Sequence, residues 1–195
     1  EIVTPEPIEQ PALAPTDDPA PTAEAIINFA AINAALKNEA LKTQPADTLI
    51  KIVLATEDGE FISFAKFLRA LMPELEGNTD LMAFIKDNFK DEFSTYLYYD
   101  TNGVWPIYKA ALRESVTTDV VTLKSKLAAL EAVAISNFYI TSPGTPTAFR
   151  DGQVNNYPTR YAAFAQPGAS FNYGLIGPDL VISASYQGLK KLLGQ

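Results

Sequence analysis

Four acidic residues, Glu92, Asp100, Asp151 and Asp179, lie at predicted turns or strand ends, where their carboxylates could take part in catalysis. Two carboxylates about 5–10 Å apart across a cleft can hydrolyse a glycosidic bond. Most of the other acidic residues lie in a proline-rich N-terminal segment or on predicted helix surfaces, where a solvated carboxylate is the usual outcome. A carboxylate-dependent hydrolase of cell-wall glycans is therefore one candidate function.

The composition excludes several other chemistries. The chain contains no His and no Cys, so Ser-His-Asp catalysis, thiol nucleophiles, His-ligated metals and zinc-thiolate sites cannot form within it. It also lacks a phosphate-binding loop and a dinucleotide-binding fingerprint, because its glycines are scattered among predicted turns. We therefore predict no metal and no cofactor, and a non-enzymatic role is favoured while an enzymatic one stays open.

A second group of residues could bind a partner without reacting with it. Tyr96, Tyr98 and Trp105 lie in one predicted hairpin. Arg150 and Arg160 flank the loop beside the sheet, where each could instead pair with a carboxylate or hold the loop in place. Tyr and Trp dominate the energetics of protein interfaces, and their rings also stack on sugars. These five residues are the predicted binding site for a protein or glycan of the cell envelope. The alternative is that the aromatic residues pair across strands and belong to the core.

The charge and hydropathy of the chain limit its partners further. Its formal net charge is -8, which opposes binding to nucleic acid and to anionic membrane surfaces. No stretch approaches the roughly 18 consecutive apolar residues that a membrane span needs. We therefore expect neither nucleic-acid binding nor membrane contact by this segment itself, and the oligomeric state stays open.

The predicted binding residues are positioned by a β-hairpin over residues 92–112. Alternation from Phe93 to Tyr99 is typical of a strand, and Asn102-Gly103 is a strong hairpin signal because both residues tolerate a positive φ. A primed turn is therefore predicted at this dipeptide. Asp100 could also begin a calcium loop, but the position that should carry the twelfth-residue glutamate is occupied by Ala111. The hairpin is the better interpretation.

The remaining elements follow from periodicity and turn residues. Helices are predicted at 22–41, 63–72, 79–89, 117–134 and 186–193, strands at 48–56, 159–166, 170–176 and 180–185, and a long loop at 136–156 with an extended piece at 147–150. This order predicts an α+β fold. It is an antiparallel sheet with helices packed on one face, in a ferredoxin-like βαββαβ order followed by a C-terminal hairpin and helix.

The N-terminal segment differs in composition from the rest of the chain. Residues 1–22 contain six of the 14 prolines, and each proline fixes φ and removes a backbone donor. This favours an extended linker or arm at 1–22, followed by a single α+β domain at 23–195. A ligand for a proline-recognising domain is the weaker alternative.

The C-terminal run TRYAAFAQPGASFNYGLIGPDLVISASYQGLKKLL combines an aromatic-rich strand, a small-residue turn, an N-Y-G strand, an L-V-I-S-x-S strand and an amphipathic helix. In this pattern, and in its proline-rich start, the chain resembles uncharacterised membrane-anchored envelope proteins of candidate-phylum bacteria. The resemblance implies an envelope-facing domain with an N-terminal anchor, and it assigns no catalytic residue. The chain begins at Glu1, which suggests a form from which such an anchor was removed.

These observations favour a non-enzymatic, extracytoplasmic binding or assembly domain of an envelope-anchored protein. Binding would use the sheet face or an exposed strand edge. The alternatives are the glycan hydrolase described above and a structural subunit of a virion or pilus, in which a proline-rich arm reaches into a neighbour.

Overall fold

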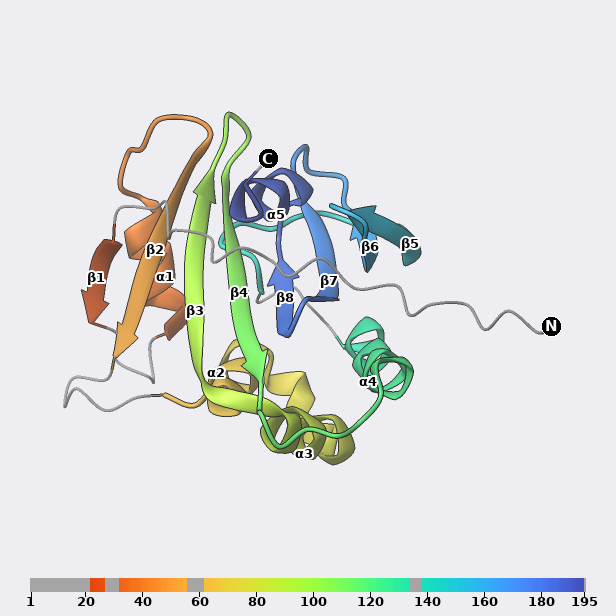
Figure 1. The fold of residues 1–195 in the computed structure, drawn as a ribbon. Coiled ribbons are helices and arrows are strands. Elements are labelled where there is room, and N and C mark those ends of the chain that lie inside the picture. Colours follow the sequence, from red (N-terminus) through yellow and green to blue (C-terminus); the bar gives the residue numbers. More distant parts are fainter. Residues whose placement is uncertain (1–21, 27–31, 56–61, 134–137, 195) are drawn as a thin grey trace.

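A computed structural model describes residues 22–26, 32–55, 62–133 and 138–194 (Figure 1). These residues form one eight-stranded sheet in the order β1-β2-β3-β4-β8-β7-β6-β5. β1 runs parallel to β2, and all other neighbours are antiparallel. The predicted α+β class with an antiparallel sheet is confirmed. The strands are β1 (Thr22–Ile26), β2 (Thr48–Ala55), β3 (Phe89–Tyr99), β4 (Val104–Leu112), β5 (Arg150–Val154), β6 (Tyr157–Ala163), β7 (Ser170–Ile176) and β8 (Asp179–Ser183).

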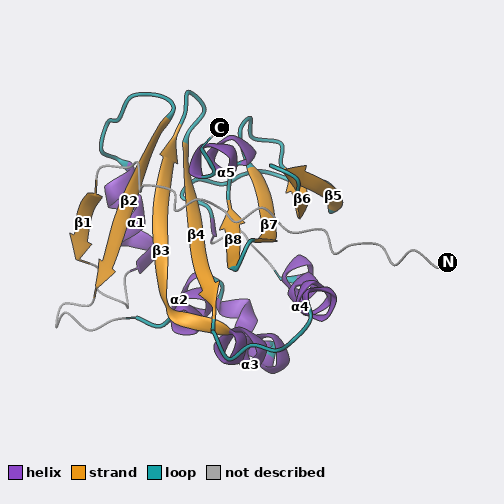
Figure 2. Ribbon diagram, viewed as in Figure 1, coloured by secondary structure: helices purple, strands orange, loops and turns teal. Residues whose placement is uncertain are grey.

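Helices lie on both sides of this sheet (Figure 2). Their bounds are α1 (Ile32–Ala40), α2 (Phe64–Leu71), α3 (Thr79–Asn88), α4 (Val120–Leu127) and α5 (Tyr186–Leu192), with short 3-10 helices η2 (Pro73–Gly77) and η3 (Ala128–Ala132). None of the helices in the described part of the chain combines the length and apolar character needed to cross a bilayer.

The prediction that helices cover one face only is wrong. Phe67 of α2 contacts Tyr108, with ring centroids 4.8 Å apart. On the opposite face, a Cβ at Gly188 of α5 would lie 3.0 Å from Ile107 Cδ1. Ile107 and Tyr108 are consecutive in β4, so their side chains point to opposite faces. Both faces of the central strands are therefore core, because each is covered by a helix.

The central hairpin is confirmed, but its turn differs from the one expected. The N–H of Asp100 donates to the carbonyl of Gly103 at 3.0 Å, which closes a four-residue turn. Asp100 Oδ1 accepts from the N–H groups of Asn102 at 2.6 Å and Gly103 at 2.9 Å. Neither Asn102 nor Gly103 is among the described residues with positive φ. The aspartate side chain, and not a primed backbone, stabilises this turn.

A primed turn is present at another position. Asn155 and Asn156 join β5 to β6 with φ values of 48° and 66°, and Val154 pairs with Tyr157 across them. Two consecutive residues with positive φ match the right-handed twist of the flanking strands, as a type I′ turn requires. The first strand of this hairpin, β5, and its turn lie inside the predicted loop 136–156, and β6 lies beyond it. The sequence prediction therefore missed β5 as a strand.

The strand pairing also differs from a ferredoxin-like unit. In that unit a third strand separates the two parallel strands of each crossover, the split βαβ arrangement, whereas here β2 lies directly beside β3 and antiparallel to it. The helices α2 and α3 separate the two strands along the chain, and because β3 is antiparallel to β2, the chain re-enters the sheet at the end that it left. The closing strand β8 lies beside β4 in the middle of the sheet and is not a peripheral addition.

The predicted helix at 22–41 is correct only in its second half. Thr22–Ile26 forms β1, which pairs with Lys51 to Ala55 of β2, and the described helix begins at Ile32. Pairing with β2, a strand distant in sequence, therefore outweighs the helical period of this stretch. The predicted arm at 1–22 lies outside the described residues apart from Thr22.

Candidate functional site

The predicted aromatic binding patch is buried and cannot serve as a surface. Tyr96, Tyr98 and Trp105 have exposed fractions of 2%, 5% and 1%. Gly188 of α5 packs against Tyr98, where an added Cβ would lie 2.9 Å from the Tyr98 Cβ. The Tyr98 hydroxyl donates to Asp47 Oδ1 at 3.2 Å. The prediction was wrong because segments distant in sequence cover this face of the hairpin: α5 packs on Tyr98, and Gly168, between β6 and β7, lies against Trp105.

Arg160 occupies the centre of an ionic cluster that spans three strands. The register places Asp151 of β5, Arg160 of β6 and Tyr173 of β7 in one row across the sheet. Arg160 donates from Nε and Nη2 to the two carboxylate oxygens of Glu131 at 2.7 and 2.9 Å, and from Nη1 to Asp151 Oδ1 at 2.9 Å. The Tyr173 hydroxyl donates to Glu131 Oε1 at 2.6 Å. The cluster ties η3 to the last three strands of the sheet edge.

The cluster also shifts the protonation of its members. The hydrogen bonds from Arg160, and secondarily the one from Tyr173, hold the pKa of Glu131 below its ordinary value. Burial raises the pKa of Tyr173, and the neighbouring Glu131 raises it further. These shifts keep Glu131 ionised and Tyr173 neutral. A general acid needs the opposite, a carboxyl group that retains its proton near neutral pH.

A groove lies beside this cluster, between α4 and the strands β6 and β7, with a volume of about 280 Å³. Its walls include Leu127, Pro158, Gly174 and Leu175, with Lys124 at the helix side. The volume is at the lower limit of small-molecule pockets. Arg160, which also lines the groove, is already paired with two carboxylates. Its guanidinium group is therefore not free to bind an anionic ligand in the groove.

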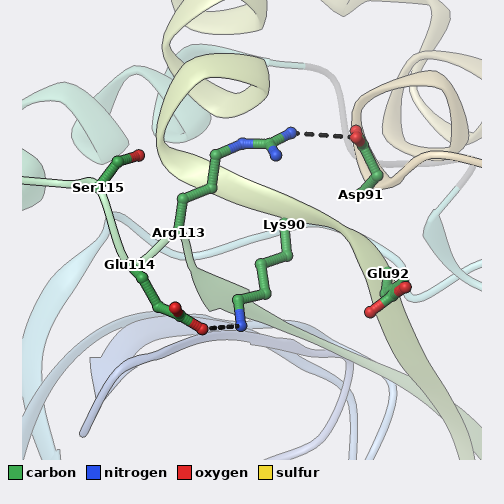
Figure 3. A pocket seen from close by; sticks show the side chains of 6 residues that line it. All are labelled: Lys90, Asp91, Glu92, Arg113, Glu114 and Ser115. Carbon is green, nitrogen blue, oxygen red and sulfur yellow. Dashed lines mark hydrogen bonds and ion pairs between the residues drawn. The ribbon is translucent and has the colours of Figure 1, made fainter.

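A second hollow is formed where β3 bulges away from β4 (Figure 3). Lys90 pairs with Glu114 at 3.1 Å, and Arg113 pairs with Asp91 at 3.1 Å. The Glu114 side chain is 91% exposed, and exposed ion pairs of this kind contribute little binding or stability. Glu92 lines the same hollow. The site is an open, mixed-charge surface without an apolar floor.

The four carboxylates singled out as catalytic candidates do not converge. Asp100 stabilises the β3–β4 turn, Asp151 binds Arg160, Asp179 lies 3.6 Å from Lys109 and Glu92 lies in the open hollow. Of the two hollows described above, Glu92 lines one and Asp151 lines the other, and Asp100 and Asp179 line neither. Three of the four carboxylates therefore have structural partners, and neither of these hollows contains two of them.

The outer edge of β5 is a further candidate surface. Arg150 and Gln153 are exposed, and the Asp151 side chain is 94% exposed. In the described part of the chain β5 pairs only with β6, so its other side is open (Figure 1). Arg150, predicted as a binding residue, lies on this edge strand, whereas Arg160 lies behind it in the ionic cluster.

Main-chain groups at this edge point outward at alternate residues. Gln153 is opposite Pro158, which has no N–H, so this pair cannot exchange two hydrogen bonds. The two-residue turn leads to the same conclusion. Val154 and Tyr157, which close this turn, form a hydrogen-bonded pair, so the next pair, Gln153 and Pro158, is a non-hydrogen-bonded pair. Asp151 and Gln153 therefore direct their N–H and C=O groups away from β6. Sequence reasoning missed this edge, although the turn residues Asn155-Asn156 between Val and Tyr were a signal for it.

The chain was also compared with known proteins. No family model, no curated protein and no solved structure matched it.

Proposed function

We propose that this chain is a non-enzymatic, extracytoplasmic binding or assembly domain of an envelope-anchored protein, and that the open edge of β5 is its binding element. The observation that carries the proposal is that the main-chain groups of Asp151 and Gln153 face outward from an edge strand whose outer side has no partner strand among the described residues. An extended segment of a partner can add to such an edge and receive its main-chain hydrogen bonds, while neighbouring side chains select the sequence.

The edge is held in one shape before a partner arrives. The Asn155-Asn156 turn sets the register of β5 on β6, and Arg160 joins Asp151 to Glu131 of η3. Ordering a flexible strand costs free energy on binding, and a preformed strand avoids much of that cost. The ionic cluster is thus a support for the binding edge and not a reaction centre.

The alternative of a glycan hydrolase has less support. It requires two carboxylates facing one another across a cleft, and Glu92, Asp100, Asp151 and Asp179 occupy separate places, three of them held by cations or by backbone N–H groups. The assay is direct: incubation of the full chain with purified peptidoglycan should release no soluble sugar. Release of sugar that is lost in a variant of one of these four residues would restore the hydrolase hypothesis.

The binding edge itself can be tested by site-specific photocrosslinking. A photoreactive residue placed at Gln153 of the full chain should form adducts when the chain is produced in its own cells. The same residue placed at Glu114, which is exposed in the hollow between β3 and β4, should not. A Gln153→Pro variant should lose the interaction, because proline has no N–H to offer the partner, while Gln153→Ala should keep it. Adducts from position 114 alone would refute the β5 edge as the binding element.

The predicted cellular setting has its own test. Fractionation of cells that carry the complete gene product should place the domain on the outer side of a membrane, accessible to protease in intact cells without their cell wall. Protection from protease until the membrane is lysed would contradict the extracytoplasmic proposal.

A further inference from the structure

We propose that the partner of β5 is the β5 strand of a second copy of this chain, joined antiparallel about a two-fold axis at Gly152. This inference rests on the proposed function, since it names the partner of the same edge. A two-fold dimer would continue the sheet from one copy into the other.

Because only alternate residues of β5 direct their main-chain groups away from β6, three two-fold pairings of β5 with itself are possible. Only Asp151 and Gln153, within β5, present main-chain groups to a neighbour, so hydrogen-bonded pairs must form between these residues of the two copies. A two-fold axis can then lie at residue 151, 152 or 153. An axis at 151 places Asp151 opposite Asp151 of the second copy, and like charges directly opposite each other destabilise a sheet.

An axis at 153 is limited by the turn. It places Asp151 opposite Asn155 of the second copy, where the positive φ of Asn155 ends the strand. An axis at Gly152 avoids both problems, because all five residues of β5 overlap. In this pairing Asp151 lies opposite Gln153 of the second copy, twice by symmetry.

The side chains of this pairing are complementary. Asp151 uses Oδ1 to accept from Arg160, which leaves Oδ2 to accept from the amide of Gln153 of the second copy. Arg150 lies opposite Val154, and Gly152 opposite itself, so no like charges meet. Gly152 is already needed within one copy, because a Cβ there would lie 2.9 Å from Tyr161 Cδ1. It is therefore unsuitable for substitution, and Gln153 is the residue to change.

The test is the concentration dependence of sedimentation for the full chain. A five-residue edge buries far less than a standard interface, so the chain should sediment as a monomer when dilute and approach a dimer when concentrated. Gln153→Lys creates two attractive contacts with Asp151 and should tighten the dimer, whereas Gln153→Asp creates two repulsive contacts and should weaken it. Each change should shift the dissociation constant by roughly tenfold. Gln153→Pro should leave a monomer.

Matched controls are available in α5. Gln187 is exposed on that helix, so Gln187→Lys and Gln187→Asp make the same changes in net charge away from the edge and should leave the dissociation constant unchanged. If the substitutions at positions 153 and 187 shifted the dissociation constant equally, the change in net charge alone would explain the effect, and the inference would be overturned. Growth beyond the dimer would also overturn it, because a two-fold pairing is closed.

The two proposals fail in different ways. A chain that stays monomeric at every concentration, including the Gln153→Lys variant, overturns the second copy as partner. If photoadducts from position 153 still form with another protein, the binding edge survives. If neither a dimer nor adducts are observed, the proposed function fails as well.

Discussion

Removal of Glu131 should release η3 from the sheet and lower the stability of the whole domain. Glu131 accepts two hydrogen bonds from Arg160 and one from Tyr173. In the Glu131→Ala variant, the hydroxyl of the buried residue Tyr173 has lost its hydrogen-bond acceptor. Arg160 then keeps only its ion pair with Asp151. Hydrogen bonds to charged groups contribute about 1.5–3 kcal/mol each when buried, and the partly exposed Arg160 reduces the sum. We expect a loss of about 2–3 kcal/mol in the free energy of unfolding.

The assay is urea denaturation near neutral pH, followed by a thermal scan. A loss of this size should lower the thermal midpoint by about 4–12 °C, since 1 kcal/mol moves the midpoint of a domain of this length by about 2–4 °C. Glu92→Ala is the control, because Glu92 is exposed in the open hollow, and it should stay within about 0.5 kcal/mol of the wild type. Equal stabilities for the Glu131 and Glu92 variants would refute a structural role for the cluster.

The pH dependence gives a second test of the same cluster. The pKa of Glu131 lies below its ordinary value of 4.5, chiefly because Arg160 stabilises the carboxylate. The ionised form therefore contributes stability at pH values above 4.5, and this contribution is lost as the pH falls through the lowered pKa. The stability gap between the wild type and Glu131→Gln, which cannot ionise, should shrink over that acidic range. A gap that stays constant or widens on acidification would contradict the ion-pair explanation.

Three further predictions follow from contacts in the central hairpin and α5. Asp100→Ala should lower the free energy of unfolding in urea by about 1 kcal/mol, because the turn loses the acceptor for its N–H groups, including that of Gly103. An unchanged denaturation midpoint would show that the backbone alone stabilises the turn. Gly188→Ala should destabilise the domain although alanine favours helices by about 1 kcal/mol, since its Cβ would lie 2.9 Å from that of Tyr98; a higher thermal midpoint would contradict this. Burial and the hydrogen bond to Asp47 raise the pKa of Tyr98 to about 12, so Tyr98 should ionise late in an ultraviolet titration, as should the other tyrosines whose pKa is raised by burial. Asp47→Asn should bring the pKa of Tyr98 alone nearer to 10, and the stability of this variant should fall less steeply above pH 10.

Local patterns in the sequence were sufficient for most of the elements. The strand Ser170–Ile176 and the helices α2 and α3 occur within one residue of their predicted bounds. Their signals are local: apolar residues at a regular period, a side-chain cap such as Asn78, whose Oδ1 accepts from Leu81 N–H at 3.0 Å, and a turn residue at the end. Such signals involve neighbours in the chain and can be read without knowing the fold.

The two hairpin turns show where local signals were insufficient. Asn102-Gly103 is the stronger sequence signal, but the side chain of Asp100 stabilises a different turn there. Asn155-Asn156 is the weaker signal, but it adopts the positive φ values of a primed turn. Competition between a side-chain hydrogen bond and a backbone preference of similar size decides between turn types, and the sequence contains both possibilities at once.

The composition by itself determined the chemistry that the chain cannot perform: without His or Cys it has no histidine base and no thiolate. Only the tertiary structure decided which residues are accessible. Tyr98 is buried because α5 returns over the hairpin from the far end of the chain, and Trp105 lies against Gly168, between β6 and β7. Arg160 is saturated because η3 brings Glu131 to it. Burial and ion pairing depend on segments that are distant in sequence, so the period of one strand cannot reveal which of its faces another element will cover.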